Sequence, residues 1–238
     1  MNQIEKNISD IQDRIEAACL KSNRNKSDVK ILLATKTVTP ENIKIALQNG
    51  ITRIGENKVQ ELKSKFEALK DIPHESHFIG HLQSNKIKEV IQYAQCIQSI
   101  DRWSLAQKLQ NRLEYEDKNI DVFIQVNTSN EASKFGIEPE KAVELAMQMK
   151  SLNRIRIKGL MTIGLFSPNP ELTRPCFKQL KQIQRELLDL DIPVHELSMG
   201  MSNDLETAIE EGSTMIRVGT AVFGKRALPD SYYWNESK

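Results

Sequence analysis

A lysine follows the first apolar run of the chain. The residues from Ile31 to Ala34 have the composition of a buried strand, Thr35 and Lys36 come next, and the turn residues from Thr37 to Pro40 follow. In α/β folds, side chains at the carboxyl ends of buried strands form the site where chemistry occurs. A lysine there acts as a nucleophile when burial or a nearby cation lowers its pKa. The alternative is an ordinary solvated lysine at a strand end, because lysine is rarely buried.

A second group of small and polar residues lies near the end of the chain. Arg217 and Val218 close an apolar run, Gly219 and Thr220 follow it, and the loop from Ser198 to Asn203 supplies two hydroxyls and a glycine. Glycine lets a backbone approach a ligand closely, and Thr220 is expected to cap a short helical turn with its hydroxyl. In α/β barrels the loops after strands 7 and 8, with a short extra helix, hold phosphate groups. The alternative is a simple turn with a capping threonine.

A nucleophilic lysine and a phosphate site together indicate two classes of protein. One forms a Schiff base between Lys36 and pyridoxal 5'-phosphate (PLP), and the other is an aldolase that uses a lysine on a phosphosugar. In a closed barrel the first and last strands are neighbours, so Lys36 and Arg217 are expected close together at one rim. These residues leave both classes open.

Other common sets of catalytic residues are missing from the sequence. It contains no P-loop motif, no Gly-x-Gly-x-x-Gly after a strand and no Gly-x-Ser-x-Gly. His74, His77 and His81 lack the spacing of a zinc helix and have no cysteines nearby, so no metal site is expected, and His77 is expected in a loop or the core. Asp101 and Glu196 have no identifiable second carboxylate, so glycosidase chemistry has no support.

The composition indicates a cytoplasmic protein. The 33 Lys+Arg and 32 Asp+Glu leave a net charge of +1, which gives no general field for nucleic acid or an anionic membrane. Cys19, Cys96 and Cys176 are too widely spaced for a zinc or disulfide framework, as expected in a reducing compartment. The charged N-terminus is unlike a signal peptide, and no apolar stretch approaches the ~18 residues of a membrane span.

Eight short apolar runs alternate with helical patterns along the chain. This alternation predicts βαβ units, and eight of them in this length favour a closed (β/α)8 TIM barrel over an open sheet. Residues 1–238 are expected to form one barrel domain, with the amphipathic helix of segment 1–24 packed outside it and a tail over 228–238 that includes Trp234. The predicted strands cover residues 30–36, 53–56, 77–80, 96–100, 122–126, 155–163, 194–197 and 214–218.

Six short sequence blocks follow one another along the chain in an order that is specific to one family. They are Ala34-Thr35-Lys36, IGENKVQE from Ile54, HFIGHLQSNK from His77, Gly159-Leu160-Met161, LSMGMS from Leu197 and IRVGT from Ile216. Together they resemble the pyridoxal phosphate homeostasis protein family, whose fold is that of the alanine racemase N-terminal barrel. The resemblance implies that PLP is the cofactor and gives each candidate residue a role. Lys36 would form the Schiff base, Ser202, Gly219 and Thr220 would hold the phosphate, Arg217 would lie against the pyridine nitrogen, and Asn57 would lie beside the cofactor.

The resemblance also bears on activity. A cation beside the pyridine nitrogen keeps it unprotonated, which makes the ring a weaker electron sink. Alanine racemases share this arginine but add a C-terminal domain whose tyrosine, from the partner subunit, is a second base. This chain ends soon after its last predicted strand. We therefore expect a monomeric, non-catalytic PLP carrier in vitamin B6 homeostasis, with apo PLP-dependent enzymes as candidate recipients. A barrel-only amino acid racemase is the alternative.

Overall fold

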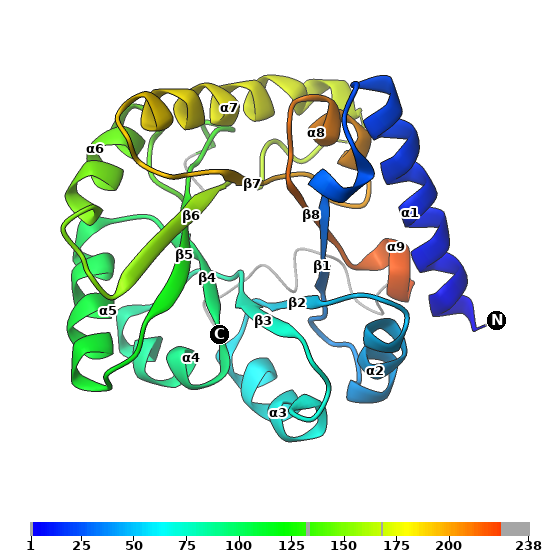
Figure 1. The fold of residues 1–238 in the computed structure, drawn as a ribbon, viewed down its shortest axis with the longest axis horizontal. Helices are drawn as coiled ribbons and strands as arrows, with labels where there is room; N and C mark the ends of the chain where they lie inside the picture. The colour runs from blue at the N-terminus through cyan, green and yellow to red at the C-terminus, as the bar shows by residue number, and fades with distance from the viewer. Residues whose placement is uncertain (1, 132–133, 168, 225–238) are drawn as a thin grey trace.

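Eight parallel strands close into a barrel, each hydrogen-bonded to the next in sequence and β8 to β1 (Figure 1). The computed structural model describes residues 2–131, 134–167 and 169–224. This is the predicted (β/α)8 barrel, so the fold expected from the alternating pattern is confirmed. The strands are β1 (Lys30–Ala34), β2 (Arg53–Glu56), β3 (Glu75–Phe78), β4 (Cys96–Ile100), β5 (Ile120–Gln125), β6 (Ile155–Met161), β7 (Glu196–Ser198) and β8 (Met215–Val218).

Helices surround the barrel on its outer side (Figure 1). Pro40 and Pro139 are the first residues of α2 and α6, because proline is tolerated in a first helical turn. After α1 (Gln3–Lys21), the helices are α2 (Pro40–Gln48), α3 (Val59–Leu69), α4 (Ile87–Tyr93), α5 (Trp103–Tyr115), α6 (Pro139–Met149), α7 (Arg174–Asp189), α8 (Leu205–Glu210) and α9 (Thr220–Phe223), with short 3-10 turns η1 (Lys26–Asp28), η2 (Ser84–Lys86) and η3 (Pro170–Leu172).

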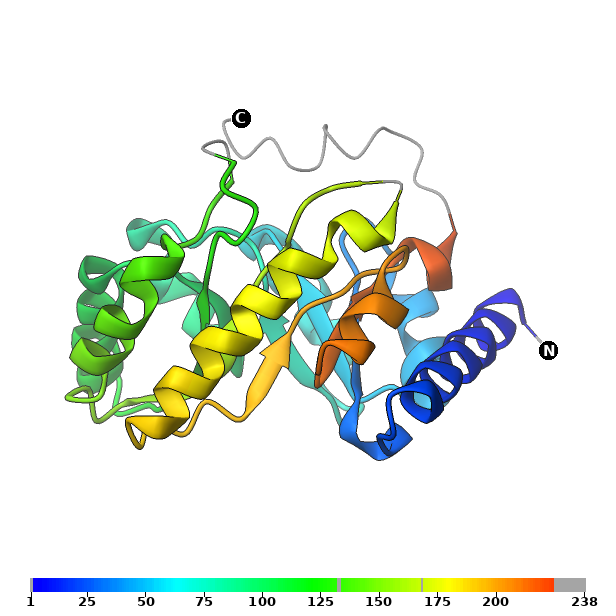
Figure 2. The same ribbon diagram turned by 90° about the horizontal axis from the view of Figure 1, so that it is seen from above.

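The extra helix α1 packs outside the barrel, as predicted, beside α8 and α9 (Figures 1 and 2). It begins with a capping box in which Asn2 and Glu5 bond each other's backbone amides. Its isoleucines at helical spacing are buried against α2, α8 and the outer face of β1 and β8. No helix in the described ranges is long and apolar enough to cross a membrane.

Two layers of apolar side chains form the core. One lies between the strands and the helices. The other fills the barrel interior with Leu32, Cys96, Phe123, Met161 and Met215. All three cysteines are buried and unpaired, which matches the absence of a disulfide framework in the sequence.

Several element boundaries differ from those predicted, because apolar composition reports burial and not strand geometry. β1 ends at Ala34 and not at 36, since Val38 N bonds Thr35 O at 2.9 Å and Thr37 has a φ of 66°. β3 and β7 are shifted by about two residues, to Glu75–Phe78 and Glu196–Ser198. The sequence pattern over 170–190 predicts one long helix, which the structure divides into η3 and α7. The predicted tail, with Trp234, lies outside the described residues.

Candidate functional site

The parallel barrel brings the candidate residues to one rim. Because every strand runs in the same direction, the residues that follow the strands meet at the carboxyl end of the barrel. Lys36 follows β1, Asn57 follows β2, Ser202 lies in the loop after β7, and Gly219 and Thr220 follow β8. Arg217 lies within β8, in register with Leu32 of β1.

Lys36 lies in the turn after β1 and is only 7% exposed. It is therefore buried, and not the solvated strand-end lysine that the sequence left as an alternative. The preceding residue, Thr35, makes two side-chain contacts. Its Oγ1 donates to Glu56 Oε1 at 2.6 Å, and its carbonyl oxygen accepts from Lys65 Nζ at 2.8 Å. These two bonds fix the backbone from which the Lys36 side chain leaves.

Lys65 and Glu56 form a buried ion pair behind this turn. Lys65 Nζ lies 2.7 Å from Glu56 Oε1, and the two residues are 6% and 1% exposed. Desolvation raises the pKa of Glu56 to about 7, although the charge of Lys65 and its hydrogen bond oppose the shift. Glu56 Oε2 has no hydrogen-bond partner among the described residues. Sequence analysis missed this pair, although a lysine on the apolar face of α3 was a usable signal.

Arg217 is a buried cation with fixed hydrogen bonds. It is 6% exposed, its Nη1 donates to Ser198 Oγ at 2.8 Å, and its Nη2 donates to Thr162 O at 2.7 Å. Burial lowers the pKa of Arg217 to about 10, and the charge of Asp204 partly offsets this effect. The guanidinium therefore stays charged at neutral pH. Among the described residues no carboxylate forms an ion pair with it.

A chain of polar contacts continues from Arg217 through the barrel interior. Ser198 Oγ donates to Gln98 Oε1 at 2.7 Å, and Gln98 Nε2 lies 2.9 Å from His77 Nδ1. If the amide donates there, the imidazole proton is on Nε2, which lies 3.3 Å from Glu75 Oε1. The contact with His77 lowers the pKa of Glu75 to about 2. His77 is thus buried in the core, which is one of the two places expected for it. No motif in the sequence indicates that Gln98 links Ser198 to His77.

The loops after β7 and β8 face each other. Ser202 Oγ lies 3.4 Å from Ala221 N and 3.5 Å from Thr220 Oγ1, which are long contacts. Gly219 is the N-cap of α9 and makes no side-chain cap, so the expectation that the Thr220 hydroxyl caps this turn is wrong. Thr220 is already the first helical residue, and its hydroxyl is directed to Ser202. The loop after β7 requires a glycine at position 200, because Gly200 has a φ of +91° and a Cβ there would lie 2.4 Å from Ala208 Cβ.

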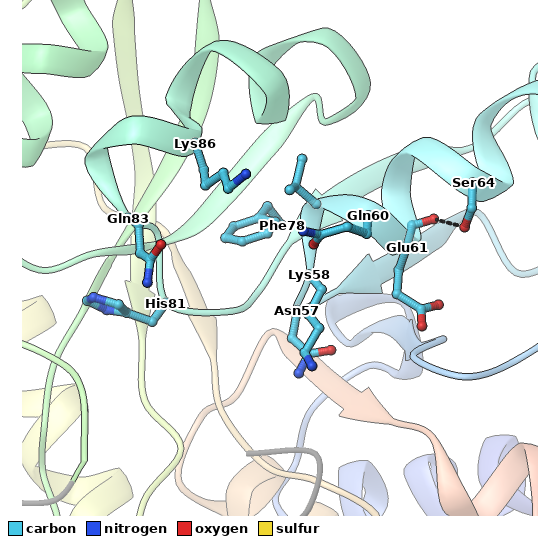
Figure 3. Close-up of a pocket in the computed structure, with 10 residues that line it drawn as sticks. Asn57, Lys58, Gln60, Glu61, Ser64, Phe78, His81, Gln83 and Lys86 are labelled. Carbon is cyan, nitrogen blue, oxygen red and sulfur yellow. Dashed lines mark hydrogen bonds between the residues drawn. The ribbon is translucent and has the colours of Figure 1, made fainter. Parts of the chain in front are cut away.

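Asn57 also lines a pocket of about 560 Å³ between α3 and the loop after β3 (Figure 3). Asn57 is held close to that loop, because a Cβ on Gly80 would lie 2.1 Å from Asn57 O. His81 borders the pocket and stacks on Phe135, with ring centroids 3.9 Å apart. The described residues contain no cluster of three or more potential metal ligands.

The fold and the buried lysine and arginine define a class, the barrels of the alanine racemase type. The family model for the alanine racemase N-terminal domain matches residues 2–227. Alanine racemase of Clostridium difficile 630 superimposes with a TM-score of 0.75 at 15% identity, over 97% of this chain and 57% of that chain, a likeness that shows the fold alone.

Within this class, the chain belongs to the pyridoxal phosphate homeostasis protein family. It is 43% identical over 227 residues to the pyridoxal phosphate homeostasis protein of Aquifex aeolicus, covering 95% of this chain and 99% of the relative. PipY of Synechococcus elongatus, solved with PLP bound, has a TM-score of 0.78 at 32% identity and covers 90% of this chain and 100% of that one. The resemblance seen in the six blocks is thereby confirmed.

Proposed function

We propose that this chain holds PLP as a Schiff base on Lys36 and acts in cytoplasmic vitamin B6 homeostasis, as a carrier or regulator and not as an efficient enzyme. The observation that carries the proposal is the buried Lys36 at the same rim as the buried, charged Arg217. The names of the relatives and the PLP bound to PipY support the choice of cofactor over a phosphosugar.

The residues at the rim fit this cofactor. A buried cation that has no carboxylate ion pair in the described part of the chain suits a position beside an uncharged ring nitrogen. In this proposal Arg217 lies against that nitrogen and Asn57 lies beside the ring. Ser202, Gly219 and Thr220 hold the phosphate, for which the facing loops offer hydroxyls and backbone N–H groups. When bound, PLP supplies an aldehyde for the lysine and a conjugated ring that accepts electrons.

The names of the relatives, which describe homeostasis and no reaction, are the reason to propose a carrier, and the environment of Arg217 is compatible with that role. A guanidinium beside the ring nitrogen disfavours its protonation, and the bonds to Ser198 and Thr162 hold the guanidinium in place. Stabilisation of negative charge at a substrate carbon is then weaker than with a carboxylate partner. A carrier further implies transfer to apo PLP-dependent enzymes. We also propose that residues 1–238 form a single domain and that the protein is a monomer.

Borohydride trapping tests the site. The purified protein is loaded with PLP, reduced, digested and analysed by mass spectrometry, with Lys36→Ala as the matched control. The expected result is a pyridoxyl-phosphate adduct on Lys36 that the variant lacks. An adduct on another lysine, or none, overturns the assignment.

A second experiment separates a carrier from an enzyme. The loaded protein is incubated in deuterium oxide with a panel of amino acids, and both racemisation and exchange of the Cα proton are followed. The carrier proposal expects negligible racemisation. Sustained racemisation at ordinary enzymatic rates contradicts it and favours the barrel-only racemase. Activation of an apo PLP-dependent enzyme by the loaded protein tests whether such enzymes receive the cofactor. Light scattering tests the monomer, for which the mass of a single chain is expected.

A further inference from the structure

Helix α1 reaches the loop after β7 through one side chain. Arg14 Nη2 donates to Ser202 O at 3.0 Å, while Arg14 Nε and Nη2 lie 2.6 and 2.9 Å from the two carboxylate oxygens of Glu206. Glu206 lies in the first turn of α8, so the guanidinium joins the Ser202 backbone to that turn. The planar guanidinium bonds both oxygens of one carboxylate and a carbonyl at once, a bidentate geometry that a lysine ammonium does not reproduce.

The same helix also reaches α9, the short helix that follows β8. Asn7 Nδ2 donates to Val222 O in α9 at 2.8 Å. Asn7 and Arg14 are seven residues apart, about two helical turns, and therefore lie on one face of α1. That face lies beside α8 and α9 (Figure 2). One rigid helix thus bonds a backbone carbonyl in the loop after β7 and another in α9.

The direct contacts between the facing loops are weak. In the loop after β7, Met201 N donates to Asp204 Oδ1 at 2.6 Å. Just before it, Gly200 O accepts from the backbone N–H of Arg217 in β8 at 2.9 Å. From Ser202 onward, the contacts to Thr220 and Ala221 are 3.5 and 3.4 Å long. The distance between the Ser202 hydroxyl and the start of α9 therefore depends on what holds each loop from outside, and α1 supplies those outside bonds.

We infer that Arg14 and Asn7 are positioning residues for phosphate binding, acting through Ser202 and Val222 without touching the cofactor. This inference rests on the proposed function, since it takes the facing loops as the phosphate site. A phosphate group needs donors from both loops at once, and donors held at the right spacing lose less free energy to ordering when they bind. Loss of the bond that positions either loop should lower the affinity for the phosphate group and leave the covalent bond to Lys36 unchanged.

The test compares two ligands that differ only in the phosphate. PLP and pyridoxal are titrated by absorbance into the unloaded forms of wild type, Arg14→Ala, Arg14→Lys and Asn7→Ala. The matched control is Lys21→Ala, which removes another α1–α8 ion pair, Lys21 Nζ to Glu210 Oε1 at 2.5 Å, without touching either loop. Exposed ion pairs contribute little to stability, so all variants are expected to fold, and thermal melting checks this.

We expect the preference for PLP over pyridoxal to fall about tenfold in Arg14→Ala and Asn7→Ala, as for loss of one ordered contact, and to stay within about twofold in Lys21→Ala. Arg14→Lys should behave like Arg14→Ala. An unchanged preference, or equal weakening of both ligands, overturns the inference. A wild-type protein that binds PLP and pyridoxal equally overturns the proposed phosphate site instead, and one that binds neither overturns the proposed function.

Discussion

Lys65 Nζ donates to the carbonyl oxygen of Thr35 at 2.8 Å. The buried charge pair on the outer side of β2 is thereby bonded to the residue directly before Lys36. The same ammonium group lies 2.7 Å from Glu56 Oε1 and 2.5 Å from Glu61 Oε2. One cation therefore joins β1, β2 and α3 at the point where the chain turns into the proposed cofactor site.

The first prediction concerns Lys65→Met. Removing the cation leaves Glu56 buried without its charge partner, and breaking a buried pair in this way costs about 3–5 kcal/mol. The free energy of unfolding from urea titration should fall by that amount, and borohydride trapping at Lys36 should weaken because Thr35 O loses its donor. The double variant Lys65→Met/Glu56→Gln should recover much of the loss. Additive losses would show that the two residues do not act as a pair.

The second prediction is a pH dependence of stability from Glu56. Its pKa of about 7 in the folded state lies above the ordinary 4.5, so the folded state binds more protons between these values. The free energy of unfolding contributed by Glu56 should be fully present below about pH 4.5 and lost as the pH rises through 7, with a slope of roughly 1.4 kcal/mol per pH unit between the two values. Glu56→Gln should lack this contribution. Parallel stability curves for wild type and variant from pH 5 to 8 would contradict the raised pKa.

The third prediction concerns Gln98→Leu. The substitution removes the link between Ser198 and His77 inside the barrel and leaves buried polar atoms unpaired, at a cost of about 1–3 kcal/mol. Because Ser198 also accepts from Arg217, the absorbance of bound PLP should change as well. Ser99→Ala is the control, since Ser99 Oγ is buried with no hydrogen-bond partner in the described structure and its loss should be neutral. Equal effects of the two substitutions would refute a role for the chain of contacts.

The fourth prediction concerns Arg217→Glu. A carboxylate in place of the guanidinium would favour a protonated ring nitrogen, so the spectrum of bound PLP should change or its retention should fall. Arg156→Ala removes an exposed arginine that pairs with Asp121 far from the rim, and it serves as the control. A normal spectrum with normal retention in Arg217→Glu would remove Arg217 from the site.

The fifth prediction concerns Gly80→Ala. A Cβ there would lie 2.1 Å from Asn57 O, so the loop after β2 must move. Stability should fall by about 1–3 kcal/mol, as in other overpacked positions, and PLP retention should fall with it. Gly50→Ala separates clash from backbone strain, because Gly50 has a φ of +86° and nothing within 4 Å of the added Cβ. It should lower stability by about 1 kcal/mol without affecting PLP.

The alternating pattern of the sequence is enough to predict the barrel and the rim at which the candidate residues lie. Eight apolar runs separated by helical patterns leave few alternatives, and parallel strands place Lys36, Asn57 and the residues after β8 at one end whatever their side chains do. The errors concerned boundaries such as the end of β1, because a buried turn and a buried strand have the same apolar composition, and the cap of α9, where Thr220 is already a helical residue.

The side chains that support that rim, in contrast, are recognisable only in the folded chain. Lys65 meets Thr35 across 30 residues and Arg14 meets Ser202 across 188. Such bonds depend on strand register, on helix rotation against the barrel and on rotamers that packing selects, and no local pattern encodes these quantities. The types of residue that do chemistry were therefore visible in the sequence, whereas the bonds that hold them at fixed spacing became visible only in the folded chain.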